Sequence, residues 1–144
     1  MYEVINLNTE KSNELKKFSH CIGQNWYHVV LIPKARYPVF KYANQRDLID
    51  ECIDKVCKNH QIEIFSKQIM DDHVHLFITC PPDYSIRKLV QIIKGGSSYL
   101  MREARPALKK YKHLWGKGYM FRSVGNVSAD RIKKYIEESN RWER

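Results

Sequence analysis

The sequence predicts an α+β fold of the ferredoxin-like (split βαβ) class, an antiparallel four-stranded sheet with two helices on one face. Segments with strand and helix periodicity follow one another in the order strand, helix, strand, strand, helix, strand. The 144 residues, 43% of them apolar, suffice for one compact core. No linker or repeat indicates a second domain, so we expect an N-terminal arm at 1–24 and a single domain at 25–144.

Alternation and periodicity predict the elements of the first half. Residues 25–32 (NWYHVVLI) are rich in aromatic and β-branched side chains and form a strand that prolines end. A helix follows at 44–59, where apolar residues recur at helical spacing. Strands at 61–70 and 73–80 are expected to pair as a hairpin around two aspartates. This hairpin places the start of the third strand at one end of the sheet.

A second long helix is predicted from Ser85, its N-cap, to Ala104. Its apolar stripe surrounds the run Lys94-Gly95-Gly96-Ser97-Ser98, in which each glycine costs about 1 kcal/mol relative to alanine. Small residues permit a close backbone approach, so Lys94 could reach a phosphate there. Tight packing or a kink explains the same residues, and the sequence leaves both readings open.

The rest of the chain is expected to complete the sheet and to add a C-terminal helix. A basic connection at 105–117 leads to a fourth strand at 118–124, which a glycine ends. A last helix begins at its cap, Ser128, and ends near Trp142. We expect this helix to carry a functional tyrosine.

The excess of positive charge lies entirely in the second half of the sequence. The net charge is +9, and residues 1–85 hold ten Lys and Arg against eleven Asp and Glu. Residues 86–144 hold fifteen Lys and Arg against five Asp and Glu. A basic face of that size favours a polyanion, nucleic acid before a membrane surface, although a merely soluble basic surface has the same composition.

The sequence indicates a cytoplasmic protein that does not enter a membrane. No apolar run approaches the ~20 residues that span a bilayer, and the N-terminus lacks a signal-peptide core. The four cysteines form no CxxC pair, so we expect reduced core residues rather than a zinc site. They are Cys21, Cys52, Cys57 and Cys80.

Two features carry possible chemistry. On a strand, His73 and His75 point to the same face, where two imidazoles bind one metal ion or simply mark the wet side of a half-buried strand. On the last helix, the phenol of Tyr135 can attack a phosphorus atom and form a covalent bond. Tyr135 shares its face with Ile132 and Ile136, so a core aromatic is the competing interpretation.

These segments together resemble a known family. DDHVHLF is similar to the HUH motif of single-stranded-DNA nucleases. With YHVVLIPKARYPVF, KGGSS and LWGKGYMFRSVGNVSADRIKKYIEES, it resembles the small single-tyrosine transposases of the insertion-sequence 200/605 family over roughly residues 25–140. The resemblance implies a homodimer, with active sites shared between subunits, that acts on single-stranded DNA hairpins at element ends. It also implies a 5′-phosphotyrosine intermediate and assistance by Mg²⁺ or Mn²⁺.

The resemblance assigns residues by position. His73 and His75 match the metal ligands, and Tyr135 matches the nucleophile. Phosphate contacts are expected from the basic second half. The candidates are Lys94, Arg122, Lys133 and Lys134.

One position departs from the family pattern. The family often supplies a third metal ligand, commonly Gln, one turn after the tyrosine, where this chain has Ser139. Ser139 itself, Glu138, Asn140 or water takes that place, or catalysis is impaired. A catalytically impaired or domesticated single-stranded nucleic-acid-binding protein is therefore the alternative, and a histidine-metal hydrolase without a covalent intermediate is a third reading.

Overall fold

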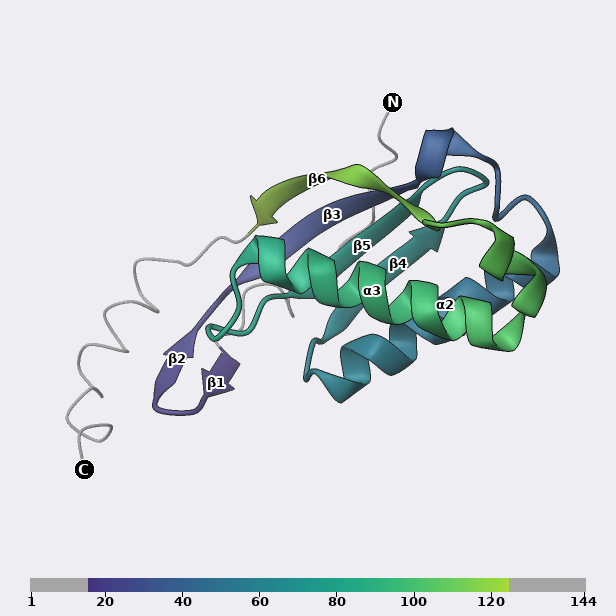
Figure 1. The fold of residues 1–144 in the computed structure, drawn as a ribbon. Coiled ribbons are helices and arrows are strands. Elements are labelled where there is room, and N and C mark those ends of the chain that lie inside the picture. The colour runs from purple at the N-terminus through teal and green to yellow at the C-terminus, as the bar shows by residue number, and fades with distance from the viewer. Residues whose placement is uncertain (1–15, 125–144) are drawn as a thin grey trace.

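The structure is a computed structural model that describes residues 16–124. Two helices lie side by side over one face of a four-stranded antiparallel sheet (Figure 1). In sheet order the strands are β4 (Ile64–Ile69), β5 (Val74–Thr79), β3 (Trp26–Pro33) and β6 (Trp115–Val124), and the helices are α2 (Ala43–Asn59) and α3 (Ile86–Ala104). The predicted ferredoxin-like sheet and helices are thus confirmed, whereas the predicted last helix lies outside the described residues. No helix within 16–124 is long and apolar enough to cross a membrane.

β3 occupies the centre of the sheet because its alternating side chains suit two different faces. Val29 and Leu31 are fully buried in the core beneath the helices. His28 and Val30 point to the opposite face, as the pleat requires. The antiparallel register then sets Val30 directly opposite His75 of β5. One strand therefore contributes to the core and to the face that carries the histidines.

α3 packs closely on α2 because a glycine stands at the contact. A Cβ atom on Gly96 would lie 2.7 Å from Cγ2 of Val56 on α2, whereas one on Gly95 would meet nothing within 4 Å. Tight packing is therefore the correct reading for Gly96. The helix begins as predicted, since Ser85 Oγ accepts a hydrogen bond from the Lys88 N–H at 3.0 Å.

Two segments differ from the prediction. The expected arm contains a small hairpin, β1 (Lys16–Phe18) and β2 (Cys21–Gly23). β6 begins at Trp115 rather than at residue 118, because the buried Trp115 indole donates to Ser97 Oγ of α3 at 3.0 Å. This side-chain contact holds the first residues of the strand against the helix, in a segment whose lysines and glycines suggested a loop.

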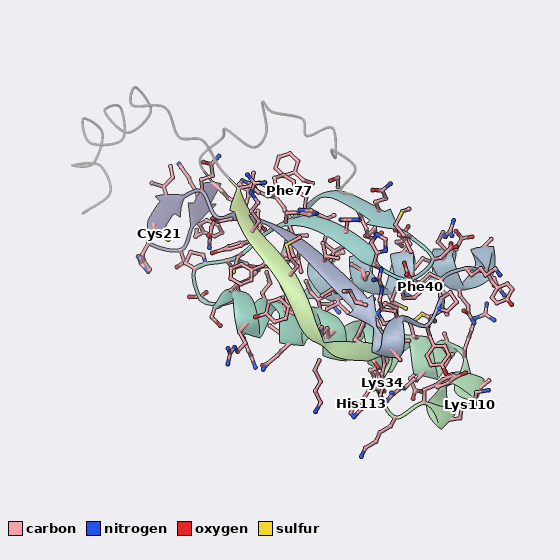
Figure 2. All side chains as sticks on the ribbon, turned by 90° about the horizontal axis from the view of Figure 1, so that it is seen from above. Cys21, Lys34, Phe40, Phe77, Lys110 and His113 are labelled. Carbon is pink, nitrogen blue, oxygen red and sulfur yellow. The ribbon has the colours of Figure 1, made fainter. Side chains whose placement is uncertain are left out.

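The cysteines are reduced thiols, as expected. Cys52, Cys57 and Cys80 are buried, and no disulfide joins any of the four, all of which are described. Burial raises the pKa of Cys57 to about 12. Cys21 is only half-buried and lies at the opposite end of the molecule from Lys34 (Figure 2). Three of the four thiols are therefore core residues.

The two glycines of α3 should respond oppositely to alanine. Gly95→Ala should raise the free energy of unfolding by up to about 1 kcal/mol, because alanine favours the helix and the site is open. Gly96→Ala should lower it by about 1–2 kcal/mol, since the new methyl group collides with Val56. Urea denaturation measures both. A stabilised Gly96→Ala protein would contradict the close helix contact, and Gly96→Ala with Val56→Ala should recover part of the loss.

Candidate active site

The two histidines of the HUH motif lie together on the sheet face away from the helices. The ring centroids of His73 and His75 are 4.9 Å apart, with the rings nearly perpendicular. Val74 between them is fully buried on the other face, as strand alternation predicted. His73 immediately precedes β5 and His75 lies within it, so the sheet fixes the backbone of both residues.

His73 has a carboxylate partner at one ring nitrogen. Its Nδ1 lies 2.8 Å from Oδ1 of Asp72, whose other oxygen, Oδ2, is 3.3 Å from the Arg36 guanidinium. The hydrogen bond with His73 is the largest of the causes that set the pKa of Asp72 below its usual value. Burial opposes it, and the nearby Arg36 charge lowers the pKa further. A carboxylate at Nδ1 favours the tautomer whose Nε2 carries the lone pair.

His75 has a histidine partner in the same position. Nδ1 of His75 lies 3.1 Å from Nε2 of His28 on β3, and the two rings stack with centroids 5.3 Å apart. Burial, and secondarily the charge of Arg122 opposite on β6, lower the pKa of His28. When Nε2 of a neutral His28 accepts a hydrogen bond from the Nδ1–H of His75, the lone pair of His75 lies at its Nε2.

The donor set fits a divalent metal ion. Each imidazole has Nδ1 engaged by a neighbour, so Nε2 is the nitrogen that each would present to the ion. Within residues 16–124 no group of three or more His, Cys, Asp and Glu side chains could hold a metal ion. Among residues 16–124, His73 and His75 could therefore contribute two ligands to such an ion, and the described residues offer no third.

The other predicted site residues are divided by the structure. Arg122 is exposed on β6 and pairs with His28, which places it beside the histidines. Lys94 instead donates to the main-chain carbonyls of Gly116, Lys117 and Gly118 at 2.8, 3.3 and 2.9 Å. Its ammonium therefore holds β6 onto α3, and the phosphate contact expected of Lys94 stays a prediction. The remaining candidates lie outside the described residues, namely Lys133, Lys134, Tyr135, Glu138, Ser139 and Asn140.

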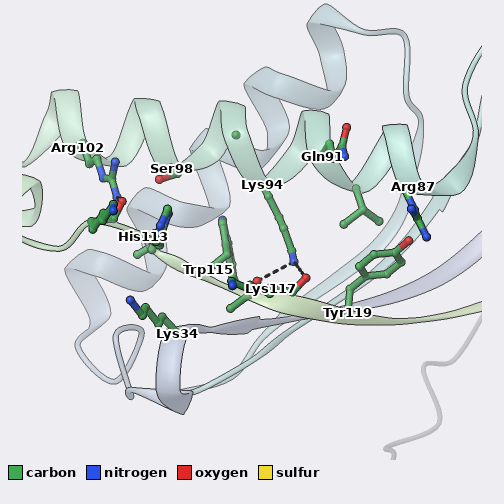
Figure 3. Close-up of a pocket in the computed structure, with 15 residues that line it drawn as sticks. Lys34, Arg87, Gln91, Lys94, Ser98, Arg102, His113, Trp115, Lys117 and Tyr119 are labelled. Carbon is green, nitrogen blue, oxygen red and sulfur yellow. Dashed lines mark hydrogen bonds between the residues drawn. The ribbon is translucent and has the colours of Figure 1, made fainter.

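A basic groove that we did not predict runs between α3 and the start of β6 (Figure 3). It has a volume of about 580 Å³, and among the described residues none of those that line it is acidic. Its cationic side chains are Lys34, Arg87, Lys94, Arg102, Lys112 and Lys117. The signal for it was the polar stripe of α3, which has helical spacing: Arg87, Gln91, Lys94, Ser98 and Arg102.

The proteins that the chain resembles are transposases of insertion sequences. Residues 21–139 match the family described as "Transposase IS200 like". The chain is 31% identical over 134 residues to the transposase for insertion sequence element IS200 of Salmonella typhimurium, covering 89% of this chain and 88% of that one. It is 28% identical over 130 residues to the ISDra2 transposase TnpA of Deinococcus radiodurans, covering 88% and 92%. The chain belongs to the IS200-like transposase family.

Solved structures agree with this assignment. A crystal structure described as a transposase from Deinococcus radiodurans superposes with a TM-score of 0.68 at 26% identity, covering 85% of this chain and 96% of that chain. A REP-associated tyrosine transposase bound to a REP hairpin has a TM-score of 0.54 at 17% identity, covering 81% and 68%. The second likeness concerns the fold alone.

Two of the four lysines that line the groove, Lys94 and Lys117, should separate a structural role from a DNA contact. Lys94→Met should lower the free energy of unfolding by about 1–3 kcal/mol, because three carbonyls lose a charged donor. The exposed Lys117→Met should leave stability within about 0.5 kcal/mol and reduce the slope of log affinity for DNA against log salt by about 1. Thermal unfolding and binding titrations at several salt concentrations measure these effects. If Lys94→Met keeps its stability and loses salt dependence, Lys94 contacts phosphate after all.

Proposed function

We propose that this transposase cleaves and rejoins single-stranded DNA at hairpin-marked element ends through a 5′-phosphotyrosine bond to Tyr135. The observation that carries the proposal is the histidine pair. His73 and His75 lie side by side, each with Nδ1 engaged by a neighbouring side chain. Family membership supports the class of reaction, and a protein of this fold is bound to a REP hairpin.

The proposed reaction consists of two exchanges of phosphodiester bonds and consumes no cofactor. The Tyr135 oxygen attacks the scissile phosphorus after losing its proton, the bond from phosphorus to the 3′ oxygen breaks, and that oxygen leaves as a 3′-hydroxyl. A second 3′-hydroxyl then attacks the phosphotyrosine and releases the phenol. His73 and His75 would hold Mg²⁺ or Mn²⁺, which would supply a Lewis acid that polarises a phosphoryl oxygen. The covalent bond conserves the energy of the broken phosphodiester.

The rest of the site is proposed from the resemblance. A homodimer would share its active sites, with Tyr135 of one subunit serving the histidines of its partner. The third ligand would be Glu138, Ser139, Asn140 or water. Phosphates would contact Arg122 beside the histidines and the exposed cations of the basic groove. Within 16–124, no acidic residue lines the groove, and the strand partner of Arg122 is His28, so these positive charges are available to DNA.

Ser139 motivates the alternative function. A serine in place of the usual glutamine removes an amide ligand, so a protein that binds hairpins without cutting them is the second candidate. The same fold and basic surfaces would serve it. The two functions differ in whether DNA becomes attached to the protein.

Covalent capture of DNA tests the main proposal. Wild-type protein incubated with hairpin-bearing single-stranded DNA and Mn²⁺ should give a protein–DNA band on a denaturing gel, which Tyr135→Phe should abolish because phenylalanine has no nucleophile. Cut DNA without a band, unaffected by Tyr135→Phe, would indicate a hydrolase. Tight binding without cleavage, over several hairpins and metals, would indicate the binding protein.

The shared site has a separate test. A His73→Ala/His75→Ala protein and a Tyr135→Phe protein should each be inactive alone. Mixed, they should recover activity, because one site in each heterodimer is then complete. Heterodimers that stay inactive would refute the trans arrangement.

His28 should affect metal binding without touching the ion. His28→Ala removes the partner of His75 Nδ1, so the affinity for Mn²⁺ should fall about 10- to 100-fold, the usual range for a group that orients a metal ligand. The signal of free Mn²⁺ in electron paramagnetic resonance measures this without any DNA. The exposed His113→Ala is the matched control and should bind as wild type does. Equal Mn²⁺ affinity in His28→Ala would show that His75 needs no orienting partner.

A further inference from the structure

Exposed aromatic rings gather in one groove of the molecule. The exposed large hydrophobic side chains of residues 16–124 number five, and three of them line a groove of about 520 Å³. These are Tyr37, Tyr42 and Tyr111, with 63%, 64% and 48% of their surface exposed. Three large exposed rings in one groove indicate a surface that binds a ligand or a partner.

The groove is also basic. Lys34, Lys110, Lys112 and His113 line it, and no acidic residue does so within the described part of the chain. The ammonium of Lys110 lies 5.1 Å from the centre of the Tyr111 ring. Figure 2 shows Lys34, Lys110 and His113 together at one end of the molecule. Aromatic faces among cations match a ligand that offers flat rings and negative charge at once.

Main-chain contacts hold the walls of the groove in place. The Arg102 guanidinium donates to the carbonyls of Tyr111 and Lys112 at 2.8 and 2.7 Å. The Lys34 N–H donates to the Leu114 carbonyl at 3.0 Å, which joins the two walls. The backbone that carries the rings is therefore fixed before a ligand binds, so binding loses little backbone conformational entropy.

The groove adjoins the histidine pair. β5 begins at the end of the sheet where antiparallel β3 ends, so the turn before His73 and the wall of the groove are neighbours. The Arg36 guanidinium lies 3.3 Å from Asp72 Oδ2, and the Phe40 N–H donates to the Asp71 carbonyl at 3.1 Å. The segment that forms one wall of the groove is therefore tied to the turn that precedes His73.

We propose that this groove binds single-stranded DNA, with bases stacked on Tyr37, Tyr42 and Tyr111 and phosphates on the surrounding lysines. The inference rests on the proposed function, for which it supplies a track that leads an unpaired strand to the active site. Stacking needs unpaired bases, so the groove distinguishes a single strand from a duplex stem. It is separate from the basic groove of α3, although both contain Lys34 and Lys112.

Binding of a plain single strand tests the groove. The probe is a fluorescein-labelled strand of about ten thymidines, long enough for one such site, without a hairpin and without divalent metal. Fluorescence anisotropy should show that Tyr42→Leu and Tyr111→Leu each weaken binding about tenfold, the scale of one lost base stack. Tyr42→Phe and Tyr111→Phe should bind within about twofold of wild type, because the ring remains. Tyr99→Leu is the matched control, since Tyr99 is 64% exposed on α3 outside the groove.

The outcomes are separable. If the leucine variants bind the single strand as Tyr99→Leu does, or if they lose the same affinity for a duplex of equal length, the tyrosines do not stack bases and the inference is wrong. Circular dichroism should show that all variants are folded, as expected for exposed positions. The assay contains neither hairpin nor metal, so its result does not depend on whether Tyr135 cleaves DNA. Failure of cleavage with intact stacking would overturn only the proposed function.

Discussion

The register between β3 and β5 is the constraint on which the rest of the structure depends. Side chains alternate along a strand, so a slip by one residue would send Val29 and Leu31 into water and the histidines into the core. The observed pairing instead buries the apolar set and brings His28 within 3.1 Å of His75. The free energy of the hydrophobic core thereby positions a polar site that contributes little to stability itself.

α3 transmits this order to the other edge of the sheet. Its apolar side is core, Gly96 sets its distance from α2, and its polar side holds β6. The Ser97 hydroxyl accepts from the Trp115 indole, and the Lys94 ammonium bonds three carbonyls just beyond it. The walls of the basic groove between α3 and β6 are thus parts of the folded core rather than a flexible addition to it.

Local patterns were enough to predict most of the fold but little of the surroundings of the site. The strand at 25–32, the helix at 44–59 and the Ser85 cap follow from periodicity and capping chemistry, and the HUH pair follows from a motif. The contacts of Lys94 with β6 could not be predicted in this way, because its acceptors lie more than twenty residues away in sequence and are main-chain atoms. His28 was missed for the same reason, since its partner stands 47 residues further along.

The uneven burial of the thiols has a practical consequence for fluorescent labelling of this transposase. Burial raises the pKa of Cys52, Cys57 and Cys80, which disfavours the reactive thiolate at neutral pH, whereas Cys21 is half-buried. A maleimide dye should therefore attach selectively at Cys21 without any mutation. That residue lies at the far end of the molecule from Lys34 and His113, so a fluorophore there would stay clear of the groove that carries the three tyrosines.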